Sequence, residues 1–282
     1  MKSTPISKEL IQGILKLRKP YSHKGDYGHA LLIAGSEGKY GASVIAANAC
    51  LRCGVGLLTV HIPKNAEEIL QSTLPEAMVE LDKSESHFTA IASDVNNYTT
   101  IGIGPGLGLQ LDTQKVFKEL LEVYRKPIVI DADGLNILAL HSEWESLIPP
   151  HSILTPHPKE FERLAGIWST EEECAGKLIN FSRILDCILI LKGHETKIAC
   201  PDGKLFVNTT GNPGMAKGGS GDALTGIITA FLAQGYTSEE ASILGVYIHG
   251  LAGDIAAERT SEFSMLPSDL IDALSEAFRR LL

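Results

Sequence analysis

Residues 30–62, ALLIAGSEGKYGASVIAANACLRCGVGLLTVHI, contain a complete strand–helix–strand unit. The continuous apolar run 30–34 predicts a buried strand, and the glycine-flanked residues 35–41 predict a loop. The alanine-rich residues 42–53 predict a helix, and residues 57–62 predict the next strand. Apolar strands separated by a helix are typical of a parallel sheet that helices cover on both faces.

The same alternation continues along the chain. Further strands are predicted at residues 99–104, 127–131, 152–155 and 187–191, and helices at residues 112–124, 158–164 and 171–185. Residues 197–200 and 204–207 flank Pro201-Asp202-Gly203, which favours a β-hairpin at one edge of the sheet.

Helices follow the hairpin to the end of the sequence. One ends at Gly235, one begins at the capping-box pair Thr237 and Glu240, and one follows Pro267. No repeat, linker or block of charge interrupts the pattern. We therefore predict one α/β domain over residues 1–282, with a largely parallel central sheet and helices on both faces.

Composition excludes several classes of protein. The 282 residues include 25 Lys and Arg against 34 Asp and Glu, a formal net charge of −9, which argues against nucleic-acid binding through a broad basic face. No apolar run reaches the ~18 residues of a membrane span, and residues 1–20 lack the apolar core of a secretory signal. Five cysteines are typical of reduced, buried thiols, so we expect a cytoplasmic protein. Cys50 and Cys53 form a C-x-x-C motif without a second pair, which favours core cysteines over a zinc site.

The most informative motif is NPGMAKGGSGD, residues 212–222, directly before a predicted buried helix. Glycines let backbone amides approach an anion closely, and the helix directs its positive end to the same point. Gly218, Gly219, Ser220 and Gly221 are therefore predicted to form an anion hole for a transferring phosphoryl group. Asp222 is placed to accept a proton from the attacking hydroxyl. The alternative is a tight turn in which Asp222 only caps the helix.

Four more polar or glycine-rich loops follow predicted strands: GIGPGLG at 102–108, DADGLN at 131–136, TPHPKE at 155–160 and KGHET at 192–196. Each alone could be a simple turn or a capped helix start. The carboxyl ends of parallel strands meet at one edge of a sheet, where ligands of open α/β folds bind. The loops together therefore predict a nucleotide-using site. Residues 102–108 lack the dinucleotide-binding pattern G-x-G-x-x-G.

These motifs together resemble the ribokinase-like superfamily and, more closely, the ADP/ATP-dependent NAD(P)H-hydrate dehydratases. The resemblance runs from about residue 20 to 225 and includes KGDYG at 24–28, AGS at 34–36, YGA at 40–42 and GPG at 104–106, besides the last three loops above and residues 212–222. It implies a ribokinase-like fold and a repair reaction. NADH hydrate or NADPH hydrate, in the S form, is phosphorylated on its ring hydroxyl from ADP or ATP, and phosphate then leaves to restore NAD(P)H. Magnesium would bridge the nucleotide phosphates.

The resemblance also implies roles for particular residues. Positions that contact the hydrate correspond to Ala42, Gly106, His157 and Asp222. Positions that contact the adenine nucleotide correspond to Lys192, Gly193, His194, Glu195, Thr196 and Gly221. Glu160 stands where related kinases keep a glutamate that organises magnesium and water. The amides of Gly219, Ser220 and Gly221 would stabilise the moving phosphoryl group, and Asp222 would act as the base.

Bacterial relatives imply a homotetramer. Some relatives carry a second domain that epimerises the hydrate, and 282 residues with one α/β pattern leave no room for it. We therefore expect epimerisation to come from a separate epimerase, as a functional partner, or to be dispensable.

Two other functions remain possible from the sequence. One is a ribokinase-like kinase of a small alcohol, such as a thiazole or pyrimidine vitamin precursor. Related kinases carry asparagine in place of His157, so this residue, together with YGA at 40–42, favours the dehydratase. The other is a non-catalytic nucleotide-binding regulator, against which Asp222 argues because binding alone needs no base.

Overall fold

The computed structural model describes residues 3–91 and 94–282, so residues 1–2 and 92–93 of the predicted domain lie outside the described part. Within it, a ten-stranded sheet has the order β1-β10-β9-β8-β7-β6-β5-β2-β3-β4. Only β9 runs antiparallel to its neighbours, β8 and β10. The predicted largely parallel sheet is confirmed. Its strands are β1 (Thr4–Pro5), β2 (His29–Ile33), β3 (Leu57–Ile62), β4 (Met78–Leu81), β5 (Thr100–Ile103), β6 (Ile128–Ile130), β7 (Ile153–Leu154), β8 (Ile188–Leu191), β9 (Thr196–Ala199) and β10 (Leu205–Asn208).

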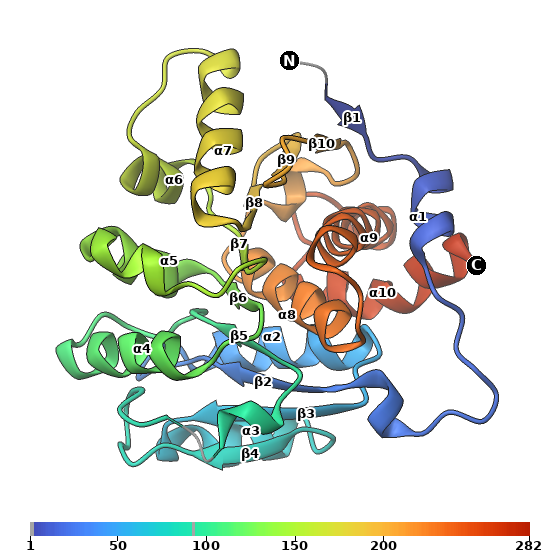
Figure 1. Cartoon of the computed structure of the whole chain (residues 1–282). Helices are drawn as coiled ribbons and strands as arrows, with labels where there is room; N and C mark the ends of the chain where they lie inside the picture. Colours follow the sequence, from blue (N-terminus) through green and yellow to red (C-terminus); the bar gives the residue numbers. More distant parts are fainter. Residues whose placement is uncertain (1–2, 92–93) are drawn as a thin grey trace.

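Helices cover both faces of the sheet, as predicted (Figure 1). Successive residues of a strand point to opposite faces. In β2, Ala30 and Leu32 therefore pack in one hydrophobic core with α2, α8, α9 and α10, while Leu31 and Ile33 pack in a second core with α4, α5 and α7. The helices are α1 (Lys8–Ile14), α2 (Tyr40–Arg52), α3 (Glu67–Thr73), α4 (Leu111–Val123), α5 (Ala132–Leu140), α6 (Pro158–Ala165), α7 (Glu171–Leu185), α8 (Ser220–Ala233), α9 (Ser238–Arg259) and α10 (Pro267–Leu281).

The predicted hairpin is present as β9 and β10, but it does not form the edge of the sheet. The edge strand is β1, in which Thr4 and Pro5 pair with Phe206 and Val207. The strands β1 and β4 and the helices α1 and α3 were not predicted from the sequence. A two-residue strand that contains proline has no local strand signal, because a partner about 200 positions away defines it.

The C-x-x-C pair lies in and just after α2, and both thiols are free and buried. Burial raises the pKa of each thiol well above its usual range. These are core cysteines, as predicted, and they are poor metal ligands because the thiolate form is disfavoured.

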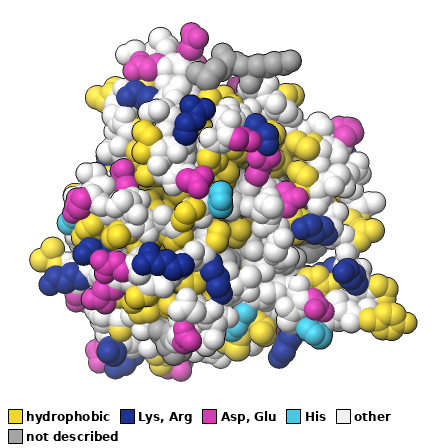
Figure 2. All heavy atoms as spheres, viewed as in Figure 1, with side chains coloured by type: hydrophobic (Ala, Val, Ile, Leu, Met, Phe, Trp, Pro, Cys, Tyr) yellow, Lys and Arg dark blue, Asp and Glu magenta, His cyan; other side chains and the backbone are white. Residues whose placement is uncertain are grey.

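The surface carries both signs of charge. On the face that Figure 2 shows, Lys and Arg side chains lie among Asp and Glu side chains instead of forming one broad basic patch. None of the described helices is both long and apolar enough to span a bilayer.

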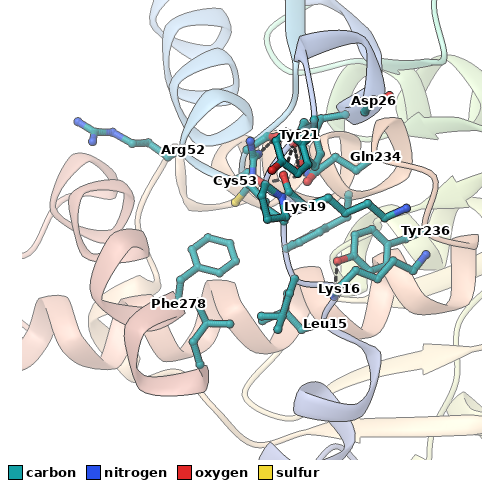
Figure 3. A pocket seen from close by; sticks show the side chains of 18 residues that line it. Leu15, Lys16, Lys19, Tyr21, Asp26, Arg52, Cys53, Gln234, Tyr236 and Phe278 are labelled. Carbon is teal, nitrogen blue, oxygen red and sulfur yellow. Dashed lines mark hydrogen bonds between the residues drawn. The ribbon is translucent and has the colours of Figure 1, made fainter.

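A cavity of about 830 Å³ opens between the α1–β2 connection and the ends of α2, α8 and α10 (Figure 3). Its lining includes Leu15, Arg18, Tyr27, Cys53 and Phe278. Both α2 and α8 end here, having begun near the carboxyl ends of the parallel strands. This cavity therefore lies at the amino edge of the parallel strands, away from the predicted site.

Candidate active site

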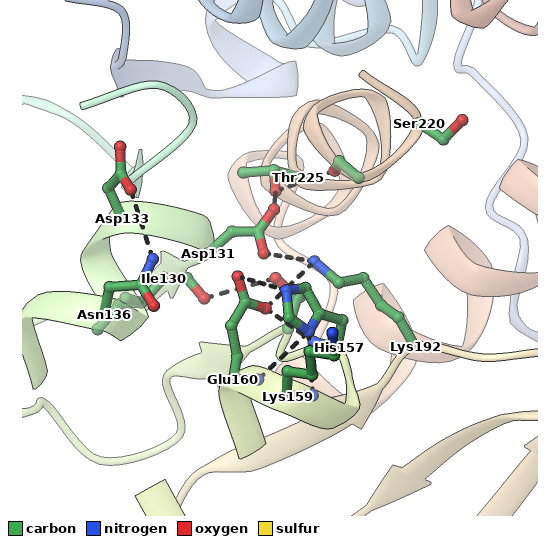
Figure 4. A network of polar contacts seen from close by, with 12 residues as sticks. Ile130, Asp131, Asp133, Asn136, His157, Lys159, Glu160, Lys192, Ser220 and Thr225 are labelled. Carbon is green, nitrogen blue, oxygen red and sulfur yellow. Dashed lines mark hydrogen bonds and ion pairs between the residues drawn. The ribbon is translucent and has the colours of Figure 1, made fainter. Parts of the chain in front are cut away.

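Three loops that the sequence analysis singled out meet around Asp131, the residue that follows β6 (Figure 4). The ammonium Nζ of Lys192, directly after β8, lies 2.6 Å from Asp131 Oδ1. The Thr225 hydroxyl, in the second turn of α8, donates to Asp131 Oδ2 at 2.7 Å. Asp131 is only 1% exposed, so this buried carboxylate ties two strand ends to the helix that follows the glycine-rich loop.

Gly104, after β5, allows the loops to come this close. Its φ of +126° lies in the region that favours glycine, and a Cβ at this position would overlap the carbonyl oxygen of Asp131. Two backbone hydrogen bonds join the same two loops. The Asp131 amide donates to the Ile103 carbonyl at 3.0 Å, and the Asp133 amide donates to the Gly104 carbonyl at 3.3 Å. The glycine-rich residues 102–108 therefore position the Asp131 loop.

The residues predicted to form the anion hole lie at the start of α8. Gly219 is the N-cap residue with φ +99°, which turns the chain into the helix. Among the described residues, the amides of Gly219, Gly221 and Asp222 donate no hydrogen bond to a protein acceptor, whereas the Ser220 amide donates to the Lys217 carbonyl at 3.3 Å. Unpaired amides at the positive end of a helix are suited to holding an anion.

Asp222 lies in the first turn of α8, within this group of amides. The pKa of its carboxyl group is raised to about 6, mainly by burial and also by the negative charges of Asp131 and Asp133, while the Lys192 ammonium opposes this change. A carboxylate in this range can accept a proton near neutral pH more readily than an ordinary aspartate can.

Among the predicted nucleotide positions, the structure brings Lys192 next to Gly221. A Cβ at Gly221 would lie 3.4 Å from Lys192 Nζ. Gly193, His194 and Glu195 are exposed in the turn between β8 and β9. The Thr196 hydroxyl closes this turn by donating to the Gly193 carbonyl at 3.1 Å.

His157 and Glu160 form the N-terminal cap of α6. His157 Nδ1 accepts from the amides of Lys159 at 3.1 Å and Glu160 at 3.2 Å, and Glu160 Oε2 accepts from the His157 amide at 2.8 Å. Because Nδ1 accepts, a neutral His157 ring carries its proton on Nε2. The His157 side chain is 45% exposed, while Glu160 is buried, with its Oε2 4.0 Å from Lys192 Nζ. Burial raises the pKa of Glu160, and the Lys192 ammonium opposes that change.

Ala42 and Gly106 lie side by side on the other flank of the Asp131 loop. A Cβ at Gly106 would lie 2.9 Å from the Ala42 Cβ, so a side chain at position 106 would press on position 42. Asp133 connects this flank to the centre, because its Oδ2 accepts from the Gly108 amide at 2.8 Å and lies 3.1 Å from Lys39 Nζ.

Thr225 and Lys39 were not among the residues predicted for the site, and Asp131 was predicted only as part of a loop. Thr225 carried a usable signal, because it is a polar residue in an apolar helical run and lies one turn after Asp222 on the same face. Lys39 carried none, because a lysine in a glycine-rich loop is usually exposed to solvent.

Comparisons with known proteins agree with this geometry. Residues 30–276 match the sequence profile of the NAD(P)H-hydrate dehydratase family. The ADP-dependent (S)-NAD(P)H-hydrate dehydratase of Bacillus subtilis is 33% identical over 276 residues, which cover 97% of each chain. A bifunctional NAD(P)H-hydrate repair enzyme of Moorella thermoacetica is 39% identical over 279 residues, 95% of this chain. The chain spans about half the length of that relative, 52%.

Solved structures extend the comparison to the fold. The Bacillus subtilis ADP/ATP-dependent NAD(P)H-hydrate dehydratase, co-crystallised with ATP and Mg²⁺, superposes with a TM-score of 0.88 at 30% identity over all of both chains. A ribokinase of Cryptococcus neoformans superposes with a TM-score of 0.59 at 14% identity over 88% of this chain and 99% of the ribokinase, which shows a shared ribokinase-like fold. The chain therefore belongs to the NAD(P)H-hydrate dehydratase family.

Proposed function

We propose that this protein dehydrates the S form of NADH hydrate and NADPH hydrate, using ADP or ATP and releasing AMP or ADP together with phosphate. The observation that carries the proposal is Asp222, a carboxylate with a raised pKa among unpaired amides at the start of α8. The names of the relatives support it, since the Bacillus subtilis protein is an ADP-dependent (S)-NAD(P)H-hydrate dehydratase.

The chemistry needs a base and an anion site in one place. Asp222 accepts the proton of the ring hydroxyl as the hydroxyl oxygen attacks the terminal phosphorus of the nucleotide. The bond from that phosphorus to its bridging oxygen breaks, and AMP or ADP leaves. The amides of Gly219, Gly221 and Asp222 hold the charge on the moving phosphoryl group. The Ser220 amide also donates to the phosphoryl group once its hydrogen bond to the Lys217 carbonyl is broken.

The second half of the reaction is an elimination. Hydroxide is a poor leaving group and phosphate is a good one, so phosphorylation prepares the ring carbon for loss of its oxygen. The lone pair of the ring nitrogen expels the phosphate, and loss of a proton from the neighbouring carbon restores the ring double bond. The products are NADH or NADPH and inorganic phosphate.

The two substrates have separate places in this proposal. The hydrate contacts Ala42, Gly106 and His157, and the contact between Ala42 and Gly106 supports a common surface there. The adenine nucleotide contacts Gly221 and residues 192–196. The proximity of Lys192 to Gly221 supports this assignment, because it puts an ammonium group beside the unpaired amides. Asp131 and Asp133 lie between the two places.

The side chains present are suited to magnesium. Asp131, Glu160 and Asp222 bring carboxylate oxygens, the ligand type that Mg²⁺ prefers, to one end of the sheet around Lys192. Glu160 would act indirectly, by orienting water around the ion. When bound, the ion would neutralise charge on the nucleotide phosphates.

A kinase of a small alcohol remains the second candidate, since ribokinase shares the fold. Both functions would use Asp222, but a kinase ends at a stable phosphorylated product. The test is to incubate the protein with NADH hydrate, magnesium and ADP or ATP, and to follow reduced-nicotinamide absorbance and free phosphate together. We expect equal amounts of both products. No turnover of hydrate, or a phosphorylated hydrate that persists, would overturn the proposal, and turnover of thiazole or pyrimidine alcohols would favour the kinase.

We also propose a single domain over residues 1–282, a homotetrameric assembly and a separate epimerase that supplies the S form. The continuous sheet from β1 to β10 supports the single domain. The relatives called bifunctional repair enzymes show that a second activity can accompany this one. Five free, buried cysteines support a reducing compartment such as the cytoplasm.

A further inference from the structure

His249, in the middle of α9, lies against the anion hole and has no role in the mechanism above. Its Nε2 is 2.9 Å from the carbonyl oxygen of Ser220. A carbonyl oxygen can only accept, so Nε2 carries the ring proton and donates it to this bond. The pKa of His249 is lowered to about 4, mainly by burial and to a lesser extent by the nearby Lys192 ammonium, while the hydrogen bond to Ser220 opposes this change, so the ring is neutral at ordinary pH.

The bonded carbonyl belongs to the same peptide group as an anion-hole donor. In a planar trans peptide, the Ser220 carbonyl and the Gly221 N–H point in opposite directions. A hydrogen bond received by the carbonyl polarises the whole peptide, which makes its N–H a stronger donor. The Gly221 amide has no acceptor among the residues that the structure describes, so this gain is available to a bound anion.

The same helix holds the other end of the glycine-rich segment. Asp254, just over one turn after His249, accepts from the Gly211 amide at 2.9 Å and from the Asn212 side chain at 3.1 Å. The Thr210 hydroxyl donates to the Tyr247 carbonyl of α9 at 3.0 Å. The segment is therefore fixed to α9 before its turn by Asp254 and after its turn by His249.

We propose that His249 is a positioning residue for phosphoryl transfer, acting through the Ser220 carbonyl to orient and polarise the peptide whose Gly221 N–H faces the transferring phosphoryl group. The inference rests on the proposed function for its kinetic consequence only. The hydrogen bond and its direction are properties of the protein without substrate.

The kinetic test compares two substitutions in the full chain. His249→Phe keeps a flat ring but cannot donate, and His249→Gln keeps a donor of similar reach. We expect His249→Phe to lower kcat by about 10- to 100-fold, less than the loss of a direct anion-hole donor, with the KM for nucleotide changed by less than about threefold. We expect His249→Gln to recover most of kcat. His29→Phe, at the start of β2 on the opposite edge of the sheet, is the matched control and should keep wild-type kcat.

Two spectroscopic measurements distinguish this positioning role from a merely structural one, and they do so without relying on the proposed reaction. In ¹⁵N-labelled wild-type protein, His249 should be protonated on Nε2 and not on Nδ1 at pH 7. The Gly221 amide proton should move upfield in His249→Phe and return toward its wild-type position in His249→Gln. A proton on Nδ1 alone, an unchanged Gly221 signal, or equal loss of kcat in both variants would overturn the proposal. Because the spectra need no substrate, they test it even if the protein turns over no hydrate.

Discussion

Asp222→Asn is predicted to stabilise the substrate-free protein at pH 8. The pKa of this carboxyl group is about 6 in the folded protein against a reference value of 3.8. Between those values the folded state binds more protons than the unfolded state, so stability falls as the pH rises through this window. The penalty is complete above pH 6 and disappears below the unfolded pKa. Asparagine has a similar shape and no charge, so the substitution removes the penalty.

The size of the effect follows from the same values. The pKa difference corresponds to about 3 kcal/mol at most, and solvent screening of this partly exposed side chain reduces it to about 1–2 kcal/mol. For a chain of this size we expect Tm to rise by roughly 2–6 °C at pH 8. At pH 4.5 the gain should shrink to roughly a third, because the wild-type carboxyl group is then mostly protonated in the folded state.

Thermal unfolding of wild type and Asp222→Asn at pH 8 and pH 4.5 measures this effect directly. Asp272→Asn is the control. The Asp272 side chain is exposed, with its Oδ1 3.9 Å from Arg52 Nη2, so the substitution should change Tm little at either pH. The reasoning fails if Asp222→Asn gains no stability at pH 8, or if it gains more at pH 4.5 than at pH 8.

The remaining predictions concern turnover, binding and folding. Asp222→Asn should lose about 100- to 10,000-fold in kcat, since it lacks the base. Calorimetry should show a nucleotide Kd within about threefold of wild type, and parallel losses of binding and rate would assign Asp222 a structural role. The kcat/KM of wild type should fall below pH about 6, as Asp222 becomes protonated. In Lys192→Ala the fall in kcat/KM should begin at a higher pH, because the ammonium lowers the pKa of Asp222 in wild type; an unchanged pH dependence would contradict this coupling. Separate titrations should show that Lys192→Ala weakens nucleotide binding more than hydrate binding, and the reverse order would refute the assignment. Gly219→Ala should destabilise the fold by at least about 1 kcal/mol in urea unfolding, because a Cβ at this positive φ would lie 2.8 Å from Ile45 and 3.0 Å from Pro267; unchanged stability would show that the turn tolerates a side chain.

Much of the fold was predictable because its signals are local. Residues 171–185 form α7 with the predicted bounds, since Thr170 caps the first turn and the apolar positions recur at helical spacing. The helix predicted at residues 42–53 runs from Tyr40 to Arg52. By contrast, residues 78–81 (MVEL) lack the apolar alternation of a core strand, and Met78 and Leu81 of β4 are exposed.

The candidate site was predictable as a set of loops but not as a set of contacts. Glycines followed by Asp222 predict an anion hole from sequence, because that chemistry depends on neighbouring residues. The bonds from Thr225 to Asp131 and from His249 to Ser220 join residues 94 and 29 positions apart. Such contacts depend on how α8 and α9 pack against the sheet, which local patterns do not specify.

The central claim is that phosphoryl transfer occurs beside Asp222 at the unpaired amides that begin α8. Its most direct test is a crystal structure of Asp222→Asn with ADP or ATP, magnesium and NADH hydrate bound together. We predict that the terminal phosphate accepts from the amides of Gly219 and Gly221, with the ring hydroxyl within hydrogen-bonding distance of residue 222. A terminal phosphate bound away from these amides, or a hydroxyl that faces another part of the protein, would contradict the account.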